Sequence, residues 1–300
     1  MELLKRVLTA VVLIPIVLLL VLRAPVPVLA LVAGGVALLA IRELLKLSEA
    51  YGIKPLSLPT HVFSGVFFVL IAINPGVTPL LSTSAFAFAG LSAAVLAPFL
   101  FLTIAMSRAE LSSAFPAAMV STFSFAYIAL PMASLVQLRE QWRGSFLLLY
   151  LLLVVWAGDI FAYFVGKSIG RHRMSPRVSP HKTWEGAVAS VIASVAVGLL
   201  MFHYAVSIST ALLNAHLIER RDGIFANHQL SLTEIVALSV VLNIAAQLGD
   251  LLESLIKRGA GAKDSGSVLP GHGGMFDRID ALLFAAPLLW CYAAWRVVMQ

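Results

Sequence analysis

The chain has 300 residues, of which 60% are hydrophobic and 12% are charged, and its mean hydropathy is +0.95. This composition excludes an ordinary water-soluble domain and indicates an integral membrane protein with several helical spans. The net charge of +6 does not indicate nucleic acid as a partner, because the basic residues are not gathered in a soluble domain with aromatic platforms. A single cysteine, Cys291, excludes a disulfide framework and a cysteine-based metal site.

Apolar segments follow one another along the chain, most of them long enough to cross a bilayer as a helix. They lie near residues 7–22, 26–41, 60–74, 84–105, 115–137, 146–166, 185–206, 232–253 and 280–298. We therefore predict an all-α fold, a polytopic integral membrane bundle of about nine transmembrane helices with a cytoplasmic N-terminus. We expect the first segment to be a retained helix, because no clear small-residue cleavage site follows it.

The basic residues support this orientation. With a cytoplasmic N-terminus and alternating sides, fifteen of the 21 Lys and Arg residues fall inside. The six that fall outside are Arg23, Arg139, Arg143, Arg220, Arg221 and Arg296. Such an excess follows the positive-inside rule. Nine of the fifteen lie in the loops 167–184 and 254–279, so the prediction depends mainly on these two loops sharing one side. We expect both to face the cytoplasm, in the inner membrane of a bacterium.

The first half of the chain, residues 1–145, offers little chemistry. Its third to fifth spans carry almost no charge, and we expect a scaffold with surface for dimer contacts. The segment Ile41–Tyr51 places Arg42, Glu43, Lys46 and Glu49 at helical spacing, which predicts an amphipathic extension at the membrane surface rather than a binding element. We expect the catalytic region in residues 146–300, within one compact bundle.

Asp159 and the loop 167–184 form the first polar group of this region. An acid inside an apolar span is usually paired or functional, so Asp159 either pairs with Lys167 or Arg171 or serves the site. Ser179 and Pro180 then break the chain before the next helix opens at Lys182, Thr183 and Glu185. This helix start suits an anion, because free N–H groups point from it; a simple cap by Thr183 is the alternative.

The second polar group, Asp250 to Asp280, contains nine of the 36 charged residues. Asp250 and Glu253 share a helix face at i and i+3, and Asp277 and Asp280 repeat that spacing. Two helix ends could thus hold one or two divalent ions between carboxylates, while Lys182, Lys257, Arg258 and Lys263 neutralise phosphates and glycines admit backbone N–H groups. This predicts phosphoryl or nucleotidyl transfer. A solvated membrane loop is the alternative.

The motif S-x-x-K-R-x4-K-D-x5-P-x-H-G-G-x-x-D-R-x-D runs from Ser254 to Asp280. It resembles the signature of phosphatidate cytidylyltransferases, the CDP-diacylglycerol synthases. The resemblance is specific over Trp156 to Asp280 and only general before it. It implies that CTP and phosphatidic acid react at the cytoplasmic face of the bilayer to give CDP-diacylglycerol and pyrophosphate. It further implies Mg²⁺, a second cation such as K⁺, and pairing of two chains as a homodimer.

Site roles follow from the resemblance. Metal binding falls to Asp250 and Asp277, and catalytic roles fall to these two together with Ser254, Lys257 and Asp280. Substrate binding is assigned to Ser179, Lys182, Thr183, Arg258, Lys263, His272, Gly273, Gly274 and Arg278. The individual roles of Glu253, His272 and Asp280 stay open. Alternatives for the whole protein are a CTP-dependent transferase acting on another lipid phosphate and an anion transporter, since acids inside the membrane also suit transport.

We predict that Asp277→Asn abolishes turnover while the protein still folds and inserts, because the substitution removes one negative charge from the proposed metal site. The measurement is CTP-dependent pyrophosphate release by the purified variant. Near-normal activity would show that the metal assignment of Asp277 is wrong.

Overall fold

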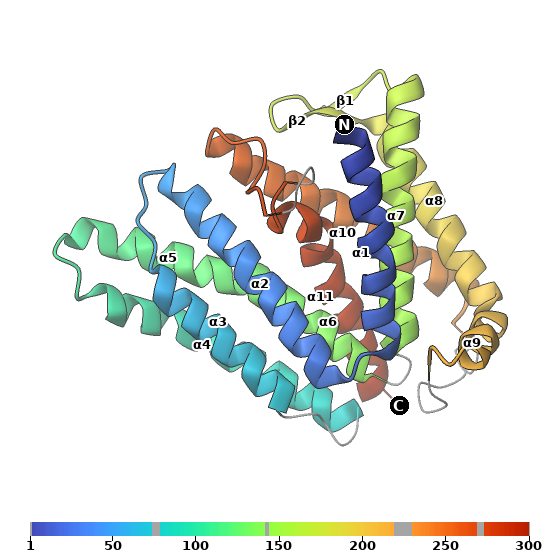
Figure 1. Ribbon diagram of the computed structural model, residues 1–300, viewed down its shortest axis with the longest axis horizontal. Helices are drawn as coiled ribbons and strands as arrows, with labels where there is room; N and C mark the ends of the chain where they lie inside the picture. Colours follow the sequence, from blue (N-terminus) through green and yellow to red (C-terminus); the bar gives the residue numbers. More distant parts are fainter. Residues whose placement is uncertain (1, 74–78, 142–143, 219–229, 269–272, 300) are drawn as a thin grey trace.

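The structure is a computed structural model that describes residues 2–73, 79–141, 144–218, 230–268 and 273–299, with side chains from Val11 onward. It confirms a polytopic helical bundle (Figure 1). The α-helices are α1 (Glu2–Arg23), α2 (Val26–Glu49), α3 (Ser57–Ile73), α4 (Pro79–Ala105), α5 (Ala114–Ser124), α6 (Leu130–Glu140), α7 (Gly144–Ile169), α8 (Trp184–His203), α9 (Ala205–Asn214), α10 (Leu232–Gly259) and α11 (Phe276–Val298). Each predicted apolar segment coincides with one of these helices or with the continuous rod of α5 and α6.

Helices form here because backbone polar groups in lipid must be satisfied within the segment itself. A short 3-10 helix, η1 (Leu111–Ser113), precedes α5, and a π-helical turn, η2 (Phe125–Ala129), joins α5 to α6. The π turn precedes Pro131, which has no N–H to donate to the preceding turn.

Two elements differ from the sequence-based expectation. The loop 167–184 contains a short antiparallel hairpin of β1 (Arg173–Ser175) and β2 (Ser179–Thr183), so the protein is nearly, rather than purely, helical. The hairpin ends where Thr183 caps α8, its hydroxyl accepting a hydrogen bond from the Gly186 N–H at 3.2 Å, so the structure shows the cap that was the alternative to an anion site at this helix start. The second element is α9, which is only 10 residues long and follows α8 directly.

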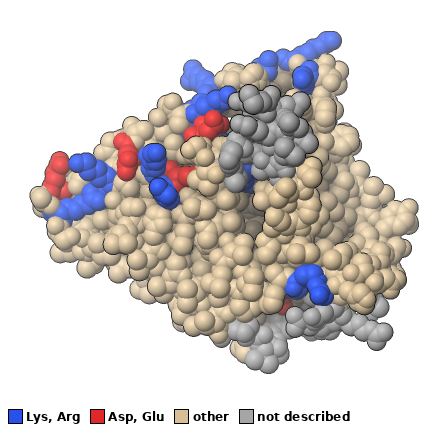
Figure 2. Space-filling view, in the orientation of Figure 1, with Lys and Arg blue, Asp and Glu red and all other residues tan. Residues whose placement is uncertain are grey.

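The surface fits a lipid environment. Within the described residues, seven helical stretches are long and apolar enough to cross a membrane. Helix α3 and the part of α1 from Val11 to Arg23 are shorter apolar helices. Phe88, Leu91 and Phe99 of α4 are between 67% and 75% exposed. Soluble proteins rarely expose large apolar side chains side by side in this way. Figure 2 shows charged side chains gathered along the upper edge, near the hairpin and the upper ends of α2 and α10, above a largely uncharged face.

Two buried apolar clusters hold the bundle together. One joins α2, α3, α4 and the α5–α6 rod, and the other joins α6, α7, α8 and α10. Helix α11 takes part in both: Phe276, Ile279 and Leu283 belong to the first cluster, whereas Ala285 and Leu289 belong to the second. The start of α1 and the end of α11 lie at opposite ends of the bundle, as an odd number of crossings requires (Figure 1). The division at residue 145 stays a prediction.

Helices α7, α8 and α10 approach closely through small and polar residues. The Asn243 amide nitrogen on α10 donates to Ser190 and Ser194 of α8, both at 2.8 Å. The space for this network comes from Gly158 on α7, where an added Cβ would lie 2.8 Å from the Ser190 hydroxyl and 2.9 Å from that of Ser194. Close helix packing inside the membrane depends on such small residues.

We predict that Gly158→Ala lowers the free energy of unfolding by about 1–3 kcal/mol, because the added methyl group overpacks this crossing. Gly35→Ala is the matched control, since an added Cβ there meets nothing within 4 Å. The control should change stability by no more than about 1 kcal/mol, in the stabilising direction that helix propensity favours. The measurement is unfolding in detergent, and equal behaviour of the two variants would contradict the packing described.

Candidate active site

The two polar loops meet at one end of the bundle. The hairpin, the end of α10 and the start of α11 lie together at the top of Figure 1. The Lys182 ammonium on β2 pairs with the Asp250 carboxylate of α10 at 2.7 Å. The Arg258 Nε, one helical turn past Ser254, donates to the Val178 carbonyl at 3.3 Å. The prediction that both loops share one side is therefore confirmed.

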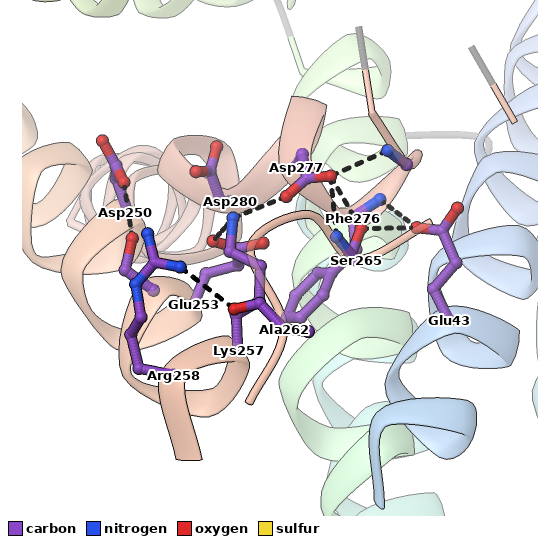
Figure 3. Close-up of polar contacts among 12 residues, drawn as sticks. Glu43, Asp250, Glu253, Lys257, Arg258, Ala262, Ser265, Phe276, Asp277 and Asp280 are labelled. Atoms are coloured by element: carbon purple, nitrogen blue, oxygen red, sulfur yellow. Dashed lines mark hydrogen bonds and ion pairs between the residues drawn. The ribbon is translucent and has the colours of Figure 1, made fainter. Parts of the chain in front are cut away.

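A cluster of three carboxylates lies where α10 and α11 touch. Asp250, Glu253 and Asp280 each place an oxygen within 4.8 Å of the others, and Glu253 is fully buried. The two helices approach each other closely at Gly249, where an added Cβ would collide with the Asp280 carbonyl oxygen. The two backbones can touch only because this residue has no side chain, and their contact brings Asp250 beside Asp280 (Figure 3). Such a group of hard oxygen atoms could hold a divalent cation.

Lys257 joins the two helices beside this cluster. Its ammonium lies 2.7 Å from Glu253 on its own helix and 2.6 Å from Asp277 on α11. Figure 3 shows this ammonium between the two carboxylates. All three side chains are buried, with exposed fractions of 11% for Lys257, 0% for Glu253 and 6% for Asp277. Buried charges of this kind persist only when they are paired.

Asp277 is occupied on both oxygen atoms. Its Oδ1 binds Lys257, and its Oδ2 accepts from the Gly274 N–H at 2.7 Å and from the Ser265 N–H and hydroxyl at 3.0 Å each. Gly273 has φ +77°, and a Cβ there would lie 2.6 Å from Asp277 Oδ2. In this structure Gly273 and Gly274 approach a carboxylate of the chain itself. Asp277 is not in the three-carboxylate cluster, and its assignment as a metal ligand stays a prediction.

Other predicted residues surround the cluster. Asp159 of α7 is exposed, and among the residues that the structure describes it forms no ion pair with Lys167 or Arg171. The Lys167 ammonium lies 5.7 Å from the centre of the Tyr163 ring. The Ser254 hydroxyl reaches Asp250 at 3.4 Å. Arg258, Lys263 and Arg278 are exposed, Ser179 and Lys182 are partly buried, and Thr183 is buried. His272 lies outside the described residues.

Glu43 of α2 is a site residue that the sequence analysis missed. Its carboxylate is 5% exposed and accepts from the Ser265 hydroxyl and from the N–H groups of Met275 and Phe276 at the start of α11. The signal lay in its helical position: Glu43 shares a face with Ala40 and Leu47, both buried, whereas Arg42, Lys46 and Glu49 lie on the exposed face. An acid inside an apolar helix face indicates a specific partner.

Fold and site together define a polytopic membrane protein that gathers buried acids and bases where its helices leave the apolar layer. The chain belongs to the cytidylyltransferase family, which it matches over residues 4–295. Three relatives are named phosphatidate cytidylyltransferase. That of Brucella abortus is 41% identical over 151 residues, which are 50% of this chain and 48% of the relative. That of Haemophilus influenzae is 36% identical over 171 residues, 55% and 54% of the two chains.

The relative from Staphylococcus aureus is 32% identical over 267 residues, which cover 87% of this chain and 88% of the relative. The matches to the Brucella and Haemophilus proteins thus span about half the length of those relatives, whereas the Staphylococcus match extends over most of both chains.

We predict that Lys257→Met lowers the free energy of unfolding by about 3–5 kcal/mol, because it leaves Glu253 and Asp277 buried without their cation. Lys263→Met removes the same charge from an exposed position and should change stability by no more than about 0.5 kcal/mol. The measurement is denaturant unfolding in detergent without divalent ions. A Lys257 variant as stable as the Lys263 variant would contradict the buried pairing.

Proposed function

We propose that the protein transfers the cytidylyl group of CTP to phosphatidic acid, forming CDP-diacylglycerol and pyrophosphate in phospholipid biosynthesis. The observation that carries the proposal is the carboxylate cluster of Asp250, Glu253 and Asp280, in which Glu253 is buried and the other two are partly exposed, with Lys182 and Lys257 beside it, at one end of a membrane bundle. Membership of the cytidylyltransferase family supports the cytidylyl chemistry. The names of the relatives support phosphatidate as the acceptor.

The carboxylate cluster fits Mg²⁺. This ion prefers hard oxygen ligands, and the three carboxylates lie close enough to share one. The Glu253 Oε1 atom is buried and has no hydrogen-bond partner in the described part of the chain, which suits an oxygen that coordinates a cation. Asp250, Glu253 and Asp280 would hold the ion, whose charge would neutralise and orient the phosphates of CTP. A second cation such as K⁺ stays a prediction.

The side chains around the cluster would position the two phosphates. In the reaction, an oxygen of the lipid phosphate forms a bond to the α-phosphorus of CTP, the bond from that phosphorus to the bridging oxygen breaks, and its electron pair leaves with pyrophosphate. Lys182, on the hairpin, and the exposed Arg258 and Lys263 would orient the triphosphate. No general base is needed, because a phosphate monoester is already largely ionised near neutral pH.

The membrane location suits such a substrate. Diacyl chains would stay in the bilayer while the headgroup enters the polar end of the bundle. The excess of Lys and Arg on the side of the two loops supports a cytoplasmic active site in a bacterial inner membrane. A homodimer remains an expectation from the resemblance.

The test measures pyrophosphate release by the purified protein with CTP, phosphatidic acid and Mg²⁺. We predict turnover that requires all three, and a loss of at least about 100-fold in Asp250→Asn, because one ligand of the proposed ion becomes neutral. Glu110→Gln, at an exposed carboxylate between α4 and α5, is the control and should keep normal activity.

The other outcomes each contradict the proposal. Turnover with a polyprenyl or prenyl-ether phosphate in place of phosphatidic acid would assign another acceptor. Binding of an anion without any pyrophosphate release would favour the transporter.

A further inference from the structure

We propose that Glu43 is a positioning residue of the active site: it fixes the first turn of α11 and thereby orients Asp277 and Asp280. The inference rests on the proposed function for its catalytic meaning, although the contacts that carry it do not. Glu43 lies on α2, in the half of the chain expected to serve as scaffold, and its partners at the site lie more than 200 residues away in the sequence.

The start of α11 has no capping side chain of its own. The first N–H groups of any helix lack a partner within that helix, and here the residue before the helix is Met275, whose side chain cannot accept their hydrogen bonds. Glu43 supplies both acceptors: its Oε1 accepts from the Met275 N–H at 2.9 Å and its Oε2 from the Phe276 N–H at 2.8 Å. A carboxylate at this position also interacts favourably with the helix dipole.

Ser265 connects Glu43 to Asp277. Its hydroxyl lies 2.9 Å from Glu43 Oε2 and 3.0 Å from Asp277 Oδ2, so two carboxylates share a group that has a single proton to donate. Asp277 in turn holds Lys257, which holds Glu253 of the carboxylate cluster. A shift of the Glu43 carboxylate would therefore be transmitted through Ser265 and Asp277 to the groups that surround the proposed ion.

The loop before α11 is shaped around the Glu43 carboxylate. An added Cβ at Gly266 would lie 2.5 Å from Glu43 Oε1 and 2.9 Å from its Cδ, and one at Gly274 would collide with Oε2. Two glycines thus leave room for one carboxylate. In the turn after α2, the Tyr51 hydroxyl donates to the Ile256 carbonyl of α10 at 2.8 Å. The end of α2 and this turn therefore contact both helices that carry the cluster.

A purely structural cap would also explain these contacts, and the two roles differ in what a substitution changes. Glu43→Gln keeps the size of the side chain but replaces one acceptor oxygen by an NH₂ group, which cannot accept from the N–H groups of α11. Glu49→Gln is the matched control, the same change at an exposed position of the same helix. The probe is Mn²⁺, whose binding to the detergent-solubilised protein is measured directly, together with the unfolding midpoint and with kcat and KM for CTP.

We predict that Glu43→Gln binds Mn²⁺ about 10- to 100-fold more weakly, as removal of a partner behind metal ligands does elsewhere, and that Glu49→Gln binds it as the unchanged protein does. The activity of Glu43→Gln should recover in part as Mg²⁺ is raised. A variant with a lower unfolding midpoint but unchanged Mn²⁺ affinity and unchanged kcat would overturn the proposal.

If Glu43→Gln does not fold, Gly266→Ala decides, because its methyl group displaces the Glu43 carboxylate without removing its charge. It should weaken Mn²⁺ binding, whereas Gly35→Ala on α2, where an added Cβ meets nothing within 4 Å, should leave Mn²⁺ binding unchanged. Equal Mn²⁺ affinities of the two variants would contradict the proposal. Failure of the proposed function would look different: the unchanged protein would show no cytidylyl transfer, while Mn²⁺ binding would still depend on Glu43.

Discussion

The structure depends on the pairing of buried charges around Lys257. One ammonium, shared by a carboxylate of α10 and a carboxylate of α11, ties the two helices together at the polar end of the bundle. Asp277, held in this way, also accepts the hydrogen bonds that shape the loop before α11. The site and the local fold are therefore the same set of interactions, and the acids cannot be rearranged for chemistry without cost to the packing of the helices.

Hydropathy and charge predicted the spans and the common side of the two loops, because both depend on the composition of continuous stretches of the chain. The cap at Thr183 was the alternative to an anion site at that helix start. The spacing of Asp277 and Asp280 along α11 could not show that the two acids contact different partners. Residues three apart differ by about 60° around a helix, so Asp280 faces Asp250 while Asp277 faces Lys257 and Ser265. Glu43 lies on the apolar face of α2, but the partners that its carboxylate binds are more than 200 residues away in the sequence.

The two halves of the chain are less separate than their sequences indicate. The first half is almost free of charge in its spans, yet it supplies Glu43 and Tyr51 to the ends of the helices that carry the carboxylates. Helix α11 completes the exchange, because its first turns pack in the apolar cluster of the first half and its later turns in that of the second. Because α11 packs in both clusters, a movement of the first half of the chain would also move the site residues that α11 carries.

The contact at Gly249 has a consequence for ionic size. Because the main chains of α10 and α11 touch there, the backbone positions of Asp250 and Asp280 are held close together. Calcium needs six to eight oxygen ligands at about 2.3–2.6 Å, whereas magnesium takes six at about 2.0–2.1 Å. A backbone contact that keeps the two acids close together would favour the smaller ion, so the glycine at position 249 would contribute to selectivity between the two metals.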